Sequence, residues 1–184
     1  MTIPTLFDHQ TPAAGPTPRP AAAGADITIV VHGTPGPQGS KRHVGNGRMV
    51  ESSKKVKPWR QDVKASALMA MSEIEDWQPL DGPLVASMTF AVRHKPSSKP
   101  SWWTPGVRWS KTLMWRPGSM PDLSKLLRAT EDALTDAGVW KDDARVVEYR
   151  RLAKHYVGDP CEDVLASGPG CVIRVWRLSE AVAS

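Results

Sequence analysis

The residues from Met120 to Tyr149 read MPDLSKLLRATEDALTDAGVWKDDARVVEY, and this stretch contains the most regular pattern in the chain. Apolar or small residues recur at about 100° per residue, which predicts an amphipathic helix. They are Leu123, Leu126, Leu127, Thr130, Ala133, Leu134 and Ala137. Gly138 is a typical C-terminal stop. Asp142 and Asp143 follow, and the residues from Ala144 to Tyr149 are typical of a strand.

Carboxylates stand at both ends of this predicted helix. Asp122 lies at its start, and Asp142–Asp143 lie just beyond its end. Asp122 has a simple structural interpretation, because a carboxylate at a helix start caps free N–H groups. The alternative is that the fold brings these acids together around a cation, which would offset the repulsion between adjacent carboxylates. Hard oxygen ligands favour Mg²⁺ or Mn²⁺ over zinc, and such a site suits metal-assisted phosphodiester cleavage.

The size and composition are those of one soluble domain with tails. The 184 residues are 40% hydrophobic and 23% charged, and the formal net charge of +5 favours an anionic partner. The first residues do not have the layout of a signal peptide, and no apolar run approaches the roughly 20 residues of a membrane span. We therefore expect a cytoplasmic protein with no membrane contact. Cys161 and Cys171 are expected to be free thiols.

The first 25 residues are rich in Pro and Ala, which predicts a disordered tail before an ordered domain at 26–180. Within the tail, Ile3-Pro4-Thr5-Leu6-Phe7 resembles a short peptide that bacterial sliding clamps bind, but the expected glutamine is absent. A stray hydrophobic pair is the alternative interpretation. In the domain, strands are predicted from Ile27, over Leu84–Arg93 and over Cys171–Leu178. A second helix is predicted to start near Pro58.

Basic residues concentrate between Gly39 and Lys64, around a glycine-rich turn that predicts a small hairpin over 41–50. We expect DNA contacts from Lys41, Arg42, Arg48, Lys54, Lys55, Lys57 and Arg60, and also from Lys125 on the central helix. The alternative is a solvated charged face. Residues 94–120 form a basic insertion with four tryptophans, at 102, 103, 109 and 115. These rings suit stacking on unpaired bases, but they also suit packing onto the core.

The central stretch resembles the RusA family of Holliday-junction resolvases. The matching residues are Pro121-Asp122-Leu123-Ser124-Lys125-Leu126 and Arg128, then Asp132-Ala133-Leu134, Trp140, Asp142-Asp143 and Tyr149. The upstream stretches GTPGPQGSKR and KPWRQDV also look like those of phage members. The resemblance covers most of 27–177 and implies a compact α/β (α+β) fold, with a mixed sheet, two main helices and a homodimer. It further implies magnesium-dependent, paired nicks across a four-way DNA junction.

The resemblance also implies roles for individual residues. The catalytic and metal-binding acids fall on Asp122 and Asp143, with Asp142 beside them, and the catalytic lysine falls on Arg128. An aspartate of the family falls on Ser124, whose hydroxyl is a weaker ligand and carries no charge. Asp142 or water can compensate, or metal affinity can fall; Glu131, two turns along the helix, is expected to lie too far away. The alternative functions are a branched-DNA-binding protein that does not cut and a recombination or replication accessory protein that acts through the tail.

Overall fold

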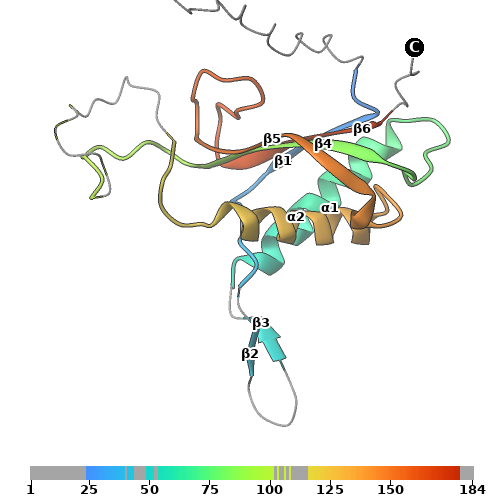
Figure 1. Ribbon diagram of the computed structural model, residues 1–184, viewed down its shortest axis with the longest axis horizontal. Coiled ribbons are helices and arrows are strands. Elements are labelled where there is room, and N and C mark those ends of the chain that lie inside the picture. Colours follow the sequence, from blue (N-terminus) through green and yellow to red (C-terminus); the bar gives the residue numbers. More distant parts are fainter. Residues whose placement is uncertain are drawn as a thin grey trace, which may run out of the picture.

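The computed structural model describes residues 24–39, 41–43, 49–51, 54–101, 103, 106, 108 and 116–178. Its strands are β1 (Ile27–His32), β2 (Lys41–His43), β3 (Met49–Glu51), β4 (Leu84–Arg93), β5 (Val146–Tyr156) and β6 (Gly170–Arg177). The helices are α1 (Val56–Ser72), α2 (Leu123–Ala137) and the 3₁₀ turn η1 (Asp143–Arg145). One sheet lies over both long helices, and the β2–β3 hairpin projects away from them (Figure 1). The structure confirms the predicted α+β class.

The main sheet has the strand order β1-β6-β4-β5. β6 pairs antiparallel with both β1 and β4, whereas β4 and β5 run parallel. A parallel pair needs a crossover connection, and here the connection between β4 and β5 contains α2. Every residue of β4 except Arg93 is buried, as expected for a central strand. The crossover therefore places α2 and the loop after it against the sheet.

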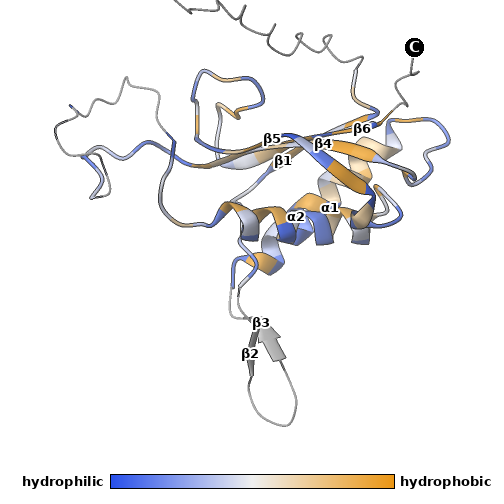
Figure 2. Cartoon of the chain, in the orientation of Figure 1, coloured by the Kyte–Doolittle hydropathy of each residue, from blue (hydrophilic) through white to orange (hydrophobic). Residues whose placement is uncertain are grey.

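The two long helices pack on each other through apolar faces. The buried residues of α1 include Trp59, Val63 and Ala67, and the buried residues of α2 include Leu126 and Leu134. Figure 2 shows apolar and polar residues alternating along α2, as an amphipathic helix requires. The apolar face thus enters the core, and the opposite face remains available for a site.

Both ends of α2 are defined by their backbone. Gly138 adopts a left-handed conformation with a φ of 81°, and its N–H bonds to the carbonyls of Leu134 and Thr135. The predicted glycine stop is therefore confirmed. At the other end, a cis peptide joins Met120 to Pro121 immediately before Asp122.

The starts of three elements and the state of the cysteines can be compared with the sequence predictions. β1 and β4 have the predicted starts, whereas α1 begins at Val56, two residues before Pro58. Both cysteines are free thiols, with Cys171 buried. In the part of the chain that the structure describes, no helix is long and apolar enough to cross a membrane. The tail before residue 24, Arg48, and the tryptophans at 102, 109 and 115 lie outside the described residues.

Candidate active site

A pocket of about 560 Å³ lies beside the polar face of α2. It is lined by Gln38, Gly39, Ser124, Lys125, Arg128, Glu131 and Asp143. Ser124, Arg128 and Glu131 occupy successive turns of one helix face, which is the spacing that aligns side chains. The loop after β1 closes one wall, because the N–H of Gln38 bonds to the carbonyl of Lys125 at 2.9 Å. Segments far apart in the sequence therefore meet here.

Asp143 enters the pocket from the loop that follows α2. This loop is attached to residue 80 on both sides: the N–H of Leu80 bonds to Val139 O, and the N–H of Lys141 bonds to Leu80 O, each at 3.0 Å. Trp140 anchors the same loop, since its indole N–H donates to Thr135 Oγ1 at 2.7 Å. The buried Trp140 ring and these bonds hold the start of η1, and Asp143 with it, next to α2.

The two other predicted acids behave differently from each other. Asp142 Oδ1 accepts a hydrogen bond from the N–H of Ala144 at 2.8 Å, so this carboxylate caps η1. Asp122 makes no side-chain cap on α2. Its Oδ2 lies 3.2 Å from the Lys125 ammonium, and Lys125 lines the pocket. Asp142 therefore caps η1, whereas Asp122 forms an ion pair with Lys125, a residue of the pocket wall.

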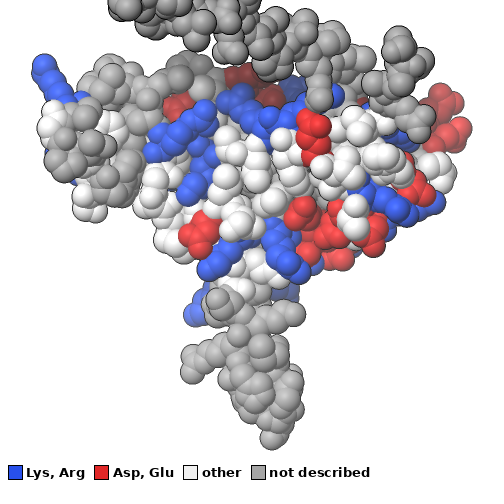
Figure 3. Space-filling model, viewed as in Figure 1, with Lys and Arg blue, Asp and Glu red and all other residues white. Residues whose placement is uncertain are grey.

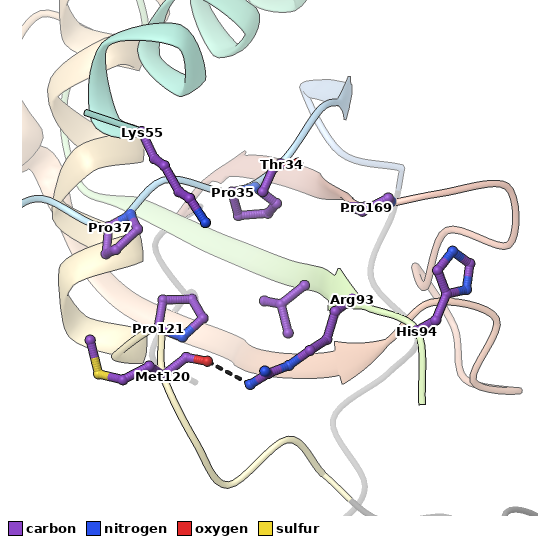
Figure 4. A pocket seen from close by; sticks show the side chains of 10 residues that line it. Thr34, Pro35, Pro37, Lys55, Arg93, His94, Met120, Pro121 and Pro169 are labelled. Atoms are coloured by element: carbon purple, nitrogen blue, oxygen red, sulfur yellow. Dashed lines mark hydrogen bonds between the residues drawn. The ribbon is translucent and has the colours of Figure 1, made fainter. Parts of the chain in front are cut away.

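Two basic residues hold the segment that presents Asp122. The Lys154 ammonium donates to the carbonyls of Ser119 at 2.9 Å and Pro121 at 2.7 Å. Arg93 donates to Ser119 Oγ at 2.6 Å and to Met120 O at 2.6 Å, and Figure 4 shows the second of these bonds. Burial and the neighbouring Arg93 charge lower the pKa of Lys154, whereas Asp122 opposes that shift. The start of α2 is therefore fixed by cations of β4 and β5.

A second pocket, of about 450 Å³, borders this segment (Figure 4). Its wall is formed by Thr34, Pro35, Pro37, Lys55, Val92, Arg93, His94, Met120, Pro121 and Pro169. Residues close in sequence line the two pockets, since Pro37 precedes Gln38 and Pro121 lies three residues before Ser124. The loop after β1 and the residues at the start of α2 therefore contribute to both pockets.

Glu131 is the residue that sequence reasoning placed too far away. It lines the same pocket as Ser124 and Asp143, and its Oε1 accepts a 2.6 Å hydrogen bond from the Tyr149 hydroxyl. Burial is the main cause that raises the pKa of Glu131; the Tyr149 hydrogen bond opposes it, and the nearby Asp143 charge adds to it. The seven-residue spacing between Ser124 and Glu131 already places them on one helix face. This spacing was the sequence signal that could have assigned Glu131 to the site.

The donor atoms of the pocket suit a hard cation. In the described part of the chain, no three His, Cys, Asp or Glu side chains are grouped closely enough to hold a metal ion. The predicted set of Asp122, Asp142 and Asp143 is therefore not gathered at one point. The pocket nevertheless offers the carboxylates of Glu131 and Asp143 and the hydroxyl of Ser124. One or two carboxylates, completed by water and phosphate oxygens, fit the usual coordination of Mg²⁺.

The predicted DNA-binding cations divide into separate groups. Lys54, Lys55 and Lys57 are exposed at the start of α1. Arg60 instead lies 3.4 Å from Asp132 and 3.1 Å from Asp136, so α2 already partly neutralises it. Lys41 and Arg42 belong to β2 of the hairpin. Lys and Arg side chains are spread over the visible face above the hairpin, with acids between them (Figure 3).

A comparison with protein families found one model, described as Endodeoxyribonuclease RusA, that matches residues 32–164. This match spans the loop after β1, both long helices and the segment that carries Asp142 and Asp143. The matched family is one of nucleases that act on DNA. The chain belongs to the RusA family of endodeoxyribonucleases, enzymes that resolve Holliday junctions. No match was found among curated proteins.

Proposed function

We propose that this protein is a metal-dependent, structure-selective endonuclease that resolves Holliday junctions by hydrolysing paired phosphodiester bonds during DNA recombination and repair. The observation that carries this proposal is the pocket beside α2. There Asp143 lies with Arg128 and Lys125, in a chain that belongs to the RusA family. Carboxylates beside cations are the arrangement that phosphodiester hydrolysis requires, because the cations bind the polyanion and the acids hold a metal ion.

Asp143 and Asp122 are the proposed protein ligands of a Mg²⁺ or Mn²⁺ ion, with Asp142 next to them. Asp143 lines the pocket directly, and Asp122 approaches it beside Lys125. Such an ion lowers the pKa of a bound water and offsets negative charge at the reacting phosphate. Asp142 orients its neighbour, because its cap on Ala144 fixes the turn in which Asp143 lies.

The two basic residues of the pocket, Arg128 and Lys125, are proposed to bind the DNA strand. Arg128 is exposed on α2, and its guanidinium fork suits bidentate binding of a phosphate. Lys125 adds a second positive charge next to it. We propose that the exposed lysines at the start of α1 and the β2–β3 hairpin position the flanking duplex, while the tryptophans of 94–120 contact unpaired bases.

A synthetic four-way junction with Mg²⁺ tests this function, with a linear duplex of the same sequence as the control. We expect symmetric nicks on two opposed strands of the junction and none on the duplex. Asp143→Asn should bind the junction normally but should not cut it. Tight binding by the wild type with no nicking in either Mg²⁺ or Mn²⁺ would instead identify a branched-DNA-binding protein, the alternative that the uncharged Ser124 suggests.

Paired cutting also leads us to propose a homodimer, because a twofold assembly supplies one site for each strand. Mixed dimers of wild type and Asp143→Asn should nick one strand only, and a monomer at working concentration would contradict this proposal. Binding of a sliding clamp through residues 3–7 stays a prediction. A pull-down with wild type and Phe7→Ala tests it, and equal recovery of both would exclude this peptide.

A further inference from the structure

The pocket beside α2 contains an acid that the predicted set did not include. Of the side chains that line it, Glu131 and Asp143 are the carboxylates, and Ser124 contributes a neutral hydroxyl. Ser124 lies in the first turn of α2, and Glu131 lies two turns later on the same face. A negative charge that is missing from the first turn is therefore present further along the same wall.

Tyr149 fixes the position of Glu131. This residue lies in β5, and its hydroxyl donates to Glu131 Oε1 at 2.6 Å across the boundary between sheet and helix. The single hydrogen bond uses a small part of the acceptor capacity of a carboxylate, which has about four lone-pair sites. Glu131 can thus accept from Tyr149 and bind a cation at the same time. Ligands held in this way by a second residue are usual at metal sites.

The electrostatic environment is consistent with a cation between the acids. Glu131 and Asp143 line one pocket, and two carboxylates held in one pocket repel each other. A divalent cation reverses this repulsion by interacting with both carboxylates. Arg128 and Lys125 in the same wall supply positive charge for the DNA phosphate.

We propose that Glu131 and Asp143 are the two pocket carboxylates that bind the divalent cation, so that Glu131 supplies the charge that position 124 lacks, and that Tyr149 is the positioning residue of Glu131. This inference rests on the proposed function, because it concerns the same pocket and the same ion. It assigns Glu131 a role that the resemblance does not imply.

Direct Mn²⁺ binding to the full chain, measured by calorimetry or by the loss of the free-Mn²⁺ paramagnetic resonance signal, tests the inference without DNA. We expect Glu131→Gln to weaken Mn²⁺ binding by about 100-fold and Tyr149→Phe by about 10-fold. Glu73→Gln is the matched control, because Glu73 is exposed at the end of α1 and does not line the pocket. Thermal unfolding of each apo variant shows whether the chain still folds.

Moving the acid from position 131 to position 124 tests whether the ion needs this carboxylate. A restored Mn²⁺ affinity also shows that the first loss was not caused by misfolding. Ser124→Asp in the Glu131→Gln background should restore most of the lost Mn²⁺ affinity. Mn²⁺ affinity that is equal in Glu131→Gln and wild type, together with a loss in Asp143→Asn, would overturn the role of Glu131 and leave the proposed function intact. Absence of Mn²⁺ binding by the wild type, with or without junction DNA, would overturn both.

Discussion

The indole N–H of Trp59 donates a 3.0 Å hydrogen bond to Thr130 Oγ1, and both residues are fully buried between α1 and α2. The Thr130 hydroxyl in turn donates to the carbonyl of Leu126 at 2.9 Å. This chain of bonds fixes the rotation of α2 about its axis. Because Thr130 faces α1, its neighbour Glu131 and the residues at 124 and 128 face the pocket.

Thr130→Val should destabilise the protein, since valine has a similar shape but cannot accept the Trp59 hydrogen bond. Leaving a buried N–H without a partner costs about 1–3 kcal/mol in the free energy of unfolding. Urea unfolding followed by tryptophan fluorescence measures this change. Thr28→Val on the exposed face of β1 is the control and should stay within about 0.5 kcal/mol of wild type. Equal stability of all three proteins would show that the buried bond contributes nothing net.

Arg128→Ala should reduce kcat for junction cleavage by about 100-fold or more, because it removes a charged donor from the pocket wall. Arg128→Lys should retain part of this activity, since the charge stays but the bidentate fork is lost. Single-turnover cleavage and junction binding, measured separately, distinguish a catalytic effect from lost affinity. Cleavage by Arg128→Ala at the wild-type rate would exclude Arg128 from the reaction.

Lys55 and Arg60 should differ in how they affect the salt dependence of DNA binding. Lys55 is exposed and lines the second pocket, whereas Arg60 is paired with Asp132 and Asp136. Lys55→Ala should therefore reduce the slope of log K against log salt concentration by about 1, as expected for one lost phosphate contact. Arg60→Ala should leave the slope unchanged. The opposite ranking would mean that DNA displaces the acids of α2 from Arg60.

His155 should make the protein less stable in mild acid. Its side chain is fully buried, and burial, with Arg116 and Arg151 nearby, lowers its pKa to about 4. Asp159 opposes this shift but does not cancel it. Because the unfolded chain takes up the proton first, stability is complete above pH 6.5 and falls as the pH drops to about 4, by at most about 3 kcal/mol.

Urea unfolding of wild type and His155→Gln across this pH range measures the contribution of His155. The difference between the two proteins removes the effect of the acidic residues, which titrate in both. We expect the wild type to lose more stability than the variant between pH 6.5 and pH 4. Parallel pH profiles would mean that His155 takes up its proton without disturbing the native state.

Local patterns were enough to predict most elements of the fold. The apolar period of α2, the glycine at 138 and the strand at 84–93 all depend on interactions between near neighbours in the chain. The free-thiol state of both cysteines was also predicted from the sequence. The family was also recognisable, because its motif lies in one short continuous stretch.

The site depended on contacts between distant residues, which spacing cannot supply. Capping was the structural alternative for Asp122, yet Asp142 is the acid that caps a turn, whereas Asp122 pairs with Lys125. Arg60 was grouped with the DNA-binding cations, but the packing of α1 on α2 turned it toward Asp132 and Asp136. In each case the deciding partner lies on another element or in a turn whose backbone direction is set by the fold.

The sequence by itself thus determined the helices, the strands and the family, since these follow from periodicity and from a contiguous motif. The tertiary structure alone decided which acids share a pocket. The parallel pairing of β5 with β4 carries Tyr149 to the side of α2, and there its hydroxyl meets Glu131. The physical reason is that the crossover connection through α2 brings residues of separate elements into contact. The charge that is missing at Ser124 can then be supplied by Glu131, two turns away on the same helix face.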